Sequence, residues 1–258
     1  MMVSFAMSGA MGRMGQMILA TAQKSNDLEC IGGLEYAASP HLGQPFGTGT
    51  ITSDVTELAK ADVIIDFSRP DGTMALITAA RQTGQALVIG TTGLDDDQED
   101  LIKQAAKEIP ILYCANTSMG VNLLAKLVEK AAAALGPEWD IEIVETHHNQ
   151  KLDAPSGTAL ALGHAAAKGR NVLLDDVRDS SRDGITGKRN EGDIGFAVMR
   201  GGNVAGEHSV MFFAEDERIE LTHVANQRTI FARGALSAAR FVAGKPAGLY
   251  SMDDVLGL

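Results

Sequence analysis

The sequence predicts an α/β protein with two domains: a doubly wound parallel sheet, followed by an α+β domain with a mixed, mainly antiparallel sheet. Over the first half, short apolar runs without internal alternation take turns with helical patterns, as is typical of parallel strands covered on both faces. After about residue 120, longer strands follow one another with few helices between them. We therefore expect a second sheet whose open face serves oligomerisation.

The first half starts with a strand that runs directly into a helix. Val3–Met7 is a continuous apolar run, and Met14, Met17 and Ile18 share one face of a helix over Gly12–Gln23. The same patterns predict strands at Glu29–Leu34, Val63–Phe67, Ala86–Ile89 and Ile111–Cys114, and helices at Thr73–Thr83 and Asp95–Glu108.

The second half opens with a long helix, Gly120–Leu135, which ends at a Gly-Pro pair. Residues 180–192 are polar and rich in Gly and Arg, which predicts a mobile loop. We assign residues 1–118 and 228–258 to the first domain and residues 119–227 to the second. The predicted strands are Asp140–Thr146, Ile194–Met199, Val204–Ala214 and Arg218–Val224, and the helices are Thr158–Lys168 and Thr229–Ala243.

The charge of the chain excludes some classes of partner. Lys and Arg number 22 against 33 Asp and Glu, which gives a net charge of −11. Such a field repels polyphosphate, so we expect neither nucleic acid nor an anionic membrane as a partner. No apolar run has the length of a membrane span, the N-terminus lacks an export signal, and Cys30 and Cys114 lie in apolar runs typical of buried free thiols. These features predict a cytoplasmic protein.

A glycine-rich turn joins the first strand to the first helix. Gly9, Gly12 and Gly15 lie three residues apart, a spacing that allows a tight turn and close approach of a pyrophosphate. Amide groups at the helix start then bind phosphate oxygens with help from the helix dipole. The motif stands in the strand-turn-helix context that dinucleotide binding requires, so we predict a Rossmann-like domain.

Glu35 lies at the end of the second strand, 20 positions after Gly15, where an acid holds the adenosine ribose hydroxyls. No Lys or Arg occurs between Lys24 and Lys60, so a 2′-phosphate beside Glu35 meets no cation from this segment. The sequence therefore favours NADH over NADPH, with Arg13 as the candidate that would support NADPH binding.

Two further turns follow predicted parallel strands. Gly90-Thr91-Thr92-Gly93 comes after one strand, and Cys114-Ala115-Asn116-Thr117 comes after the next. Small residues at the carboxyl ends of strands let the backbone approach a nicotinamide carboxamide. Either segment alone is typical of an ordinary turn, but beside the glycine motif both favour a cofactor site.

A second group of reactive residues lies between Glu145 and Thr158. His147 and His148 end a predicted strand, Lys151 follows, and Pro155 precedes a helix whose first amides, from Gly157 and Thr158, suit a carboxylate. A histidine can deliver a proton near neutral pH. Zinc is the alternative, because His164, His208 and His223 occur elsewhere, but the spacing fits no zinc-binding pattern. We therefore predict an anion-binding reaction site without metal.

At these residues the chain resembles the 4-hydroxy-tetrahydrodipicolinate reductase (dihydrodipicolinate reductase) family, nearly from end to end. The most specific motif is Glu145-x-His147-His148-x-x-Lys151-x-Asp153-Ala154-Pro155-Ser156-Gly157-Thr158. Weaker matches are Gly9-x-x-Gly12-Arg13-Met14-Gly15, Ile65-Asp66-Phe67-Ser68-Arg69-Pro70, Gly90-Thr91-Thr92-Gly93, Asn116-x-Ser118-x-Gly120-Val121-Asn122, Ile194-Gly195-Phe196, Arg200-Gly201-Gly202 and Gly206-Glu207-His208.

The resemblance implies NAD(P)H-dependent reduction of 4-hydroxy-tetrahydrodipicolinate to tetrahydrodipicolinate with loss of water, on the diaminopimelate route to lysine. It also implies a homotetramer built by the second domain. Tyr36 stands where many family members have Arg, which again favours NADH. The implied site residues are His147 and Lys151 for catalysis, His148, Gly157 and Thr158 for a cyclic dicarboxylate substrate, and Gly9, Ala10, Met11, Gly12, Arg13, Met14, Glu35, Gly90, Thr91, Thr92, Cys114, Ala115, Asn116 and Thr117 for the cofactor.

Two other functions compete with this interpretation. An acylating semialdehyde dehydrogenase needs a nucleophilic cysteine, for which Cys114 and Cys30 are the only candidates in the sequence. A non-catalytic NADH sensor would have no use for His147, His148 and Lys151 beside a helix start. Dicarboxylate binding and substrate assays distinguish these functions from the reductase.

Overall fold

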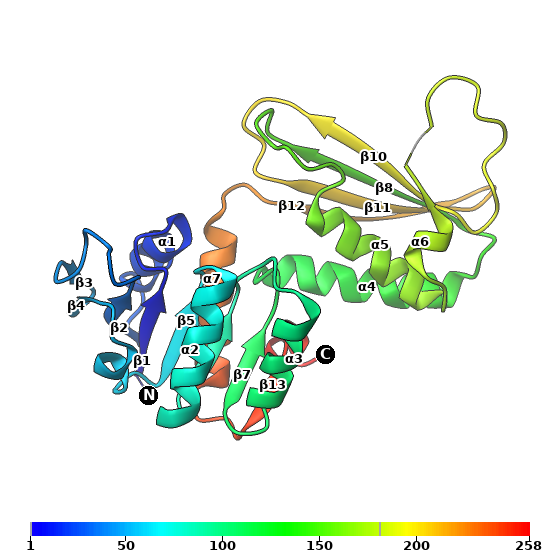
Figure 1. The fold of residues 1–258 in the computed structure, drawn as a ribbon. Coiled ribbons are helices and arrows are strands. Elements are labelled where there is room, and N and C mark those ends of the chain that lie inside the picture. Colours follow the sequence, from blue (N-terminus) through cyan, green and yellow to red (C-terminus); the bar gives the residue numbers. More distant parts are fainter. Residues whose placement is uncertain (1, 181) are drawn as a thin grey trace. The chain divides into compact units, whose positions relative to one another are not determined.

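The computed structural model describes residues 2–180 and 182–258, so Met1 and Ser181, the latter in the predicted mobile loop, lie outside the described residues. The chain divides into two compact units (Figure 1). Unit 1 is Met1–Met119 with Thr229–Leu258, and unit 2 is Gly120–Arg228. The helix α7 (Thr229–Val242) thus belongs to unit 1, although it follows unit 2 in the sequence.

The described part of unit 1 contains one eight-stranded sheet in the order β13-β7-β6-β5-β1-β2-β4-β3. All neighbouring pairs are parallel except β3 with β4, as the continuous apolar runs predict. The order reverses at β1, which has β2 on one side and β5 on the other. The strands are β1 (Val3–Ser8), β2 (Leu28–Leu34), β3 (Pro45–Phe46), β4 (Gly49–Thr52), β5 (Val63–Asp66), β6 (Ala86–Ile89), β7 (Pro110–Tyr113) and β13 (Gly248–Tyr250).

Helices cover both faces of this sheet. Phe5 and Met7 of β1 pack in one apolar cluster with residues of α1 and α7, whereas Ala6 packs in a second cluster with α2 and α3. Adjacent residues of β1 therefore point into two different cores, and Figure 1 shows α2 and α3 together on one side of the strands. The helices are α1 (Arg13–Ala22), η1 (Val55–Leu58), α2 (Pro70–Thr83), α3 (Asp96–Ala105), α7 and α8 (Met252–Leu256).

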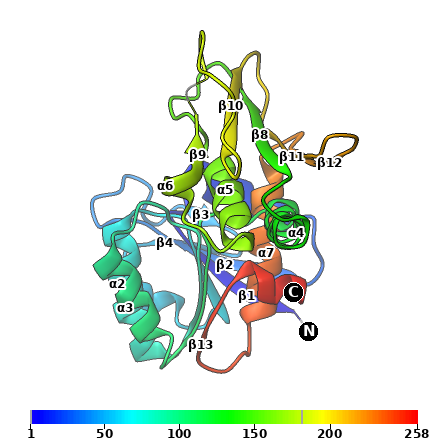
Figure 2. The same ribbon diagram turned by 90° about the vertical axis from the view of Figure 1, so that its right-hand side faces the viewer.

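Unit 2 contains a five-stranded sheet in the order β12-β11-β8-β10-β9. It is mixed, because β8 is parallel to β10 but antiparallel to β11. The helices α4 and α5 pack on one face, which we call the inner face, through an apolar cluster that includes Ile141 and Ile143 (Figure 2). The elements are α4 (Met119–Leu135), β8 (Asp140–His147), α5 (Gly157–Gly169), α6 (Leu174–Val177), β9 (Arg178–Asp179), β10 (Ile194–Arg200), β11 (Glu207–Phe213) and β12 (Arg218–Val224).

Sequence patterns miss the shortest elements and extend one strand too far. The strands β3, β4, β9 and β13 and the helices η1, α6 and α8 have only two to five residues, too few to show a period. The strand predicted at Val204–Ala214 begins at Glu207, because Gly206 has a φ of +152°, outside the extended strand conformation.

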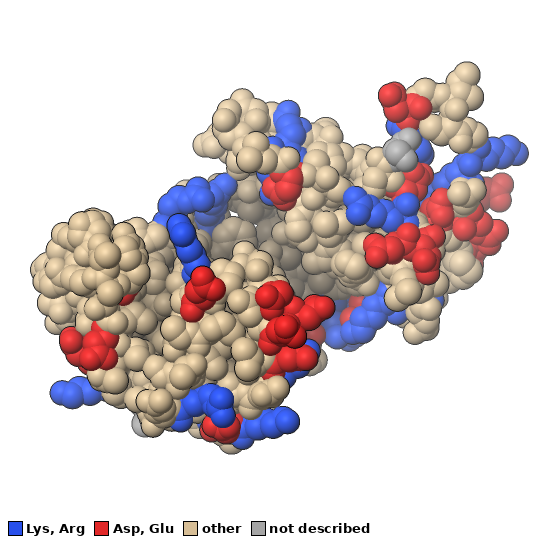
Figure 3. Space-filling view, viewed as in Figure 1, with Lys and Arg blue, Asp and Glu red and all other residues tan. Residues whose placement is uncertain are grey.

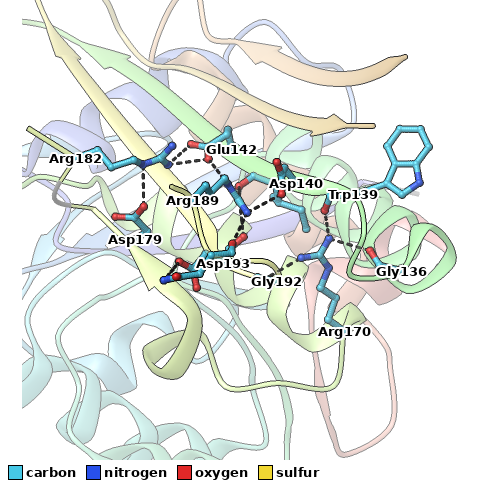
Figure 4. A network of polar contacts seen from close by, with 12 residues as sticks. Gly136, Trp139, Asp140, Glu142, Arg170, Asp179, Arg182, Arg189, Gly192 and Asp193 are labelled. Atoms are coloured by element: carbon cyan, nitrogen blue, oxygen red, sulfur yellow. Dashed lines mark hydrogen bonds and ion pairs between the residues drawn. The ribbon is translucent and has the colours of Figure 1, made fainter. Parts of the chain in front are cut away.

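The predicted loop at 180–192 contains no helix or strand in its described residues, and arginines anchor it. Arg182 donates to Glu142 at 2.6 and 2.7 Å and pairs with Asp179 at 2.8 Å. Arg189 contacts Asp140 at 2.8 Å and Glu142 at 3.0 Å (Figure 4). These ion pairs hold the described part of the loop against the start of β8, at the opposite end of the strand from His147.

Candidate functional site

A groove of about 850 Å³ lies at the point where the strand order of unit 1 reverses. Residues at the carboxyl ends of β1, β2 and β5 line it, including Ser8, Glu35 and Phe67. In open α/β sheets this is the position at which ligands bind. The groove has the volume of a small-molecule site.

The glycine turn beside this groove has space for backbone but not for side chains. A Cβ on Gly9 would lie 2.7 Å from the carbonyl oxygen of Phe67, and one on Gly15 would lie 2.4 Å from that of Ala10. Gly9 also has a φ of +75°. No side chain of the described residues caps the N-terminus of α1. The turn is therefore a cradle with an uncapped helix dipole, which fits a pyrophosphate.

Glu35 connects the end of β2 to this turn. Its Oε1 atom accepts a hydrogen bond of 2.8 Å from the backbone amide of Met11. The carboxylate thus lies in the groove, where a ribose hydroxyl can donate to its remaining lone pairs. Tyr36 and Arg69 line the same groove, and Tyr36 is 66% exposed. Arg69 lies outside the segment between Lys24 and Lys60, whose lack of Lys and Arg led us to predict a preference for NADH. It therefore adds a positive charge that this prediction did not consider.

Asp66, the last residue of β5, organises the neighbouring loops. Its carboxylate is fully buried and accepts hydrogen bonds from Thr73 at 2.5 Å, Thr91 at 2.9 Å and the Ser68 amide at 3.2 Å. These bonds tie the start of α2 and the Gly90–Thr92 turn to the end of β5. Thr91 thus uses its hydroxyl within the protein and has backbone groups to offer a ligand.

The segment 114–117 follows β7 at the same edge of the sheet. The Cys114 amide donates to the Ile89 carbonyl at 3.1 Å, and the Thr117 hydroxyl donates to the Phe231 carbonyl at 2.8 Å. Asn116 accepts a bond of 2.9 Å from the Ser118 amide. The structure therefore brings the predicted cofactor residues to one edge of unit 1, although Ala10 is fully buried and contributes no side chain to a ligand.

The predicted reaction site lies in unit 2, where β8 changes character along its length. Every second residue faces the helices, so Ile141, Ile143, Glu145 and His147 share the buried face. The first two pack in the apolar core, whereas the last two are polar. Strand alternation thus places a carboxylate and an imidazole inside the unit.

Glu145 is 1% exposed and is held from three sides. It contacts Nδ1 of His147 at 2.5 Å, it accepts two bonds of 2.8 Å from Arg200, and it accepts the Ser156 amide at 2.9 Å. Burial alone would raise the pKa of Glu145, but the hydrogen bonds from Arg200 and His147 outweigh burial and lower it below its ordinary value. The carboxylate is therefore ionised at neutral pH.

His208 packs beside His147 with the ring centroids 5.1 Å apart in an edge-on arrangement. It lies opposite Glu145 on β11, and its Nε2 atom is 3.0 Å from the Ser156 hydroxyl. Burial, followed by repulsion from His147, lowers the pKa of His208 to about 4. His208 is therefore neutral and serves as packing and as a hydrogen-bond partner.

The loop after β8 carries the other predicted residues. Lys151 forms an ion pair of 2.8 Å with Asp153, and this hydrogen bond lowers the pKa of Asp153. His148 contacts Arg228 at 3.0 Å through Nε2. Burial, followed by the charge of Arg228, lowers the pKa of His148. The site thus holds cations at Lys151, Arg200 and Arg228 around two histidines.

The helix α5 starts at this site. Ser156 caps it by accepting the amide of Ala159 at 3.1 Å, and Gly157 and Thr158 form the first turn. The bond from the Ser156 amide to Glu145 ties this turn to β8. His147, Lys151 and the start of α5 therefore lie at one end of unit 2, which can bind an anion and exchange a proton with it.

Glu145, Arg200, Ser156, His208 and Arg228 have contacts in the site that the motif analysis did not assign. The alternation along β8 could have identified Glu145, because it places this residue on the same buried face as Ile141 and Ile143. A carboxylate on a buried face needs a partner. That partner, Arg200, is 55 residues away in the sequence, so no local pattern links the two residues.

Other candidate chemistries find little support. Burial raises the pKa of Cys30 to about 11 and that of Cys114 to about 12, so both are thiols at neutral pH and neither suits a nucleophile. Within residues 2–180 and 182–258, no group of three or more His, Cys, Asp and Glu side chains is placed to hold a metal ion.

No helix among the described residues is long and apolar enough to cross a bilayer. Basic and acidic side chains are interspersed on the face shown in Figure 3.

Comparison with known families matches both units. The family described as "Dihydrodipicolinate reductase, N-terminus" matches residues 3–117, and "Dihydrodipicolinate reductase, C-terminus" matches residues 120–256. A 4-hydroxy-tetrahydrodipicolinate reductase of Parvibaculum lavamentivorans is 50% identical over 266 residues, covering 99% of this chain and 98% of the relative. One of Zymomonas mobilis is 51% identical over 257 residues, with 99% and 98% covered.

Solved structures agree with the sequence relatives. A dipicolinate-bound dihydrodipicolinate reductase from Paenisporosarcina sp. TG-14 has a TM-score of 0.81 and 25% identity, covering 97% of this chain and 98% of that chain. A DAP dehydrogenase of C. glutamicum shares the fold, with a TM-score of 0.56 at 13% identity, covering 97% of this chain and 92% of that chain. The family matches over both units and the full-length identities together show that this chain belongs to the dihydrodipicolinate reductase family.

Proposed function

We propose that this chain reduces 4-hydroxy-tetrahydrodipicolinate to tetrahydrodipicolinate with loss of water, in the diaminopimelate route to lysine, and that His147 supplies the proton. The observation that carries the residue assignment is the buried pair of Glu145 and His147 beside the first turn of α5. A dicarboxylate and a proton donor are required at one place, and this end of unit 2 offers both an anion site and an imidazole. The dipicolinate bound by the Paenisporosarcina enzyme has the same two carboxylates as this substrate class.

The groups around His147 suggest how the substrate is held. Backbone amides of Gly157 and Thr158 at the helix start, together with Lys151 and His148, bind the two carboxylates. Lys151 must exchange its partner Asp153 for a substrate carboxylate or bind both, which three ammonium donors allow. The ring is thereby oriented toward His147, and proton delivery needs no diffusing acid.

The groove of unit 1 holds the dinucleotide in this proposal. Gly9–Met14 surround the pyrophosphate, Glu35 binds the adenosine ribose, and the turns at 90–92 and 114–117 approach the nicotinamide. When bound, NADH or NADPH supplies the hydride. Unit 1 is thus the dinucleotide-binding domain and unit 2 the substrate-binding domain.

The role of His147 is tested by His147→Ala with substrate generated in situ. We expect kcat to fall by about 10²–10⁴-fold, the usual contribution of a positioned acid, while KM changes little. A variant with near-normal turnover would remove His147 from the chemistry. The single variant Lys151→Met removes a cation that binds the substrate and leaves His147, the proton donor, in place. We expect it to raise KM, because a substrate carboxylate loses a contact.

We propose that NADH is the preferred cofactor. Among the described residues that line the groove, Glu35 and Asp71 are acidic and Arg69 is the one cation. Tyr36 stands where many relatives have Arg. Steady-state kinetics with both cofactors test this. Tyr36→Arg should raise kcat/KM for NADPH by about tenfold, one charge-assisted phosphate contact, with Tyr36→Gln as the uncharged control. A wild type that prefers NADPH would reject the proposal.

We also propose that unit 2 builds a homotetramer through the outer face of its sheet. That face carries Met199 and Val224, which are 53% and 51% exposed, and the helices cover the opposite face. Met199→Lys should shift the mass measured by light scattering toward smaller species while circular dichroism stays unchanged. Glu191→Lys, an exposed loop change, is the control. A monomeric wild type would contradict the proposal.

A further inference from the structure

The contacts of Glu145 come from its own strand, from the start of α5 and, 55 residues away in the sequence, from Arg200. Arg200, at the end of β10, is directly in register with His147 on β8. Its guanidinium donates two bonds of 2.8 Å to the Glu145 carboxylate and a third, of 2.7 Å, to the Asp153 carbonyl. Such a bidentate pair fixes the plane of the carboxylate as well as its charge.

The ionised carboxylate determines which nitrogen of His147 carries a proton. A carboxylate can only accept, so the 2.5 Å contact requires a hydrogen on Nδ1 of His147. In the neutral ring, Nε2 is then an acceptor, and in the protonated ring it becomes a donor. Two neighbours restrict the ring: the edge-on His208 at 5.1 Å, and Gly206, where a Cβ would lie 3.0 Å from Nε2.

We propose that Glu145 and Arg200 are positioning residues of the reduction: Glu145 holds His147 in its Nδ1-protonated form, and Arg200 holds Glu145. This inference rests on the proposed function. After the substrate has lost water, its ring accepts a hydride at one carbon of a C=C bond. The electron pair of that bond then forms a C–H bond at the neighbouring ring carbon with the proton from Nε2 of His147. The N–H bond breaks, and the imidazolium becomes a neutral imidazole still bonded to Glu145 through Nδ1.

Replacing the carboxylate by an amide gives the sharpest test. In Glu145→Gln the amide can donate to Nδ1 and so favour the tautomer with its hydrogen on Nε2. We expect kcat to fall by about 10–10²-fold, less than in His147→Ala, with KM within about threefold of wild type.

Several titratable or charged groups besides Glu145 surround this histidine. His208 on β11, Arg200 on β10, and His148 and Lys151 in the loop after β8 are those near it. None of these groups is replaced in Glu145→Gln, so a change in kcat or in the tautomer of His147 reports the carboxylate. Arg200→Met should lower kcat similarly, and Arg200→Lys should restore part of it, because a lysine keeps the charge but not the two-point contact.

The opposite end of β8 offers a matched control. Glu142 accepts bonds from Arg182 and Arg189, so Glu142→Gln breaks a comparable carboxylate-arginine contact on the same strand without touching His147. This variant should keep the wild-type kcat and the wild-type tautomer of His147. Melting temperatures and circular dichroism of all variants identify any loss of fold.

A readout independent of activity is the ¹⁵N NMR spectrum of the histidine rings. At alkaline pH the wild type should show a protonated Nδ1 and an unprotonated Nε2 for His147, and Glu145→Gln should show the reverse. An unchanged tautomer and unchanged kcat in Glu145→Gln, with His147→Ala impaired, would reject the positioning role alone. Absence of reductase activity in the wild type would reject the proposed function itself.

Discussion

A central strand of unit 1 is buried on both of its faces, whereas a central strand of unit 2 is buried on only one. All four residues of β5 are buried, whereas burial alternates along β8. Helices cover both faces of the first sheet, so its strand interiors are apolar and its chemistry lies in the loops at the strand ends. The second sheet has helices on one face, and polar side chains such as Glu145 and His147 lie within its strands.

This difference also determines the kind of group that each unit offers a ligand. Unit 1 presents mostly backbone, from the glycine turn and the turns after β6 and β7. Unit 2 presents ionisable side chains at the end of its inner face. Glu35 is the exception in unit 1, because its carboxylate lies in the groove at the end of β2.

The largest expected effect is on the free energy of unfolding, and it compares two adjacent residues of β5 with two adjacent residues of β8. Ile64→Ala and Ile65→Ala should each lower the free energy of unfolding by about 2–5 kcal/mol, because both side chains are fully buried, on opposite faces of the sheet. Ile143→Ala should cost as much, but Val144→Ala, on the outer face, about 1 kcal/mol or less. Urea unfolding in the Met199→Lys background measures this without a second copy covering the face. Equal costs at positions 143 and 144 would contradict the one-sided sheet.

A smaller effect compares the first turns of α1 and α5. Gly15→Ala should destabilise the protein by about 3 kcal/mol, because its Cβ would lie 2.4 Å from a backbone oxygen that cannot move freely. Gly157→Ala meets nothing within 4 Å and should change stability by less than about 0.5 kcal/mol. Thermal unfolding followed by calorimetry compares them. If both variants melt like the wild type, the close packing of α1 on the glycine turn is wrong.

The smallest effect concerns acid. The folded pKa of His208 is about 4, against an ordinary value of 6.5, so the unfolded chain binds more protons between these values and stability falls as the pH falls through this window. We expect a loss of about 2 kcal/mol at pH 5 relative to pH 7.5. In unit 1, the Arg240 hydrogen bond lowers the pKa of Asp27, and that contribution is lost only below about pH 3.8.

Hydrogen exchange followed by mass spectrometry locates this acid sensitivity. At pH 5, after correction for the intrinsic exchange rate, amides of β8 and β11 in unit 2 should lose protection before those of β1 and β5. His208→Gln should reduce the difference between pH 5 and pH 7.5. Equal loss of protection in both units would contradict the assignment to His208.

Local patterns predict most of the long elements of both units. The apolar runs of β1, β5 and β6 and the apolar face of α4 are visible within each segment, because burial selects residues at the period of the backbone. The two-residue β3 and the three-residue β13 have no period to detect. Pairing decides them: β13 becomes a strand because Gly248–Tyr250 lie beside Pro110–Leu112.

The reactive residues divide in the same way. The sequence by itself determined that a glycine turn follows the first strand and that His147, Lys151 and a helix start occur within 12 residues, since residue type and spacing carry that information. Only the tertiary structure decided that Arg200 holds Glu145, that His208 packs on His147, and that Arg69 shares a groove with Glu35. Those contacts depend on strand order and register, which arise when distant segments bury their apolar faces together.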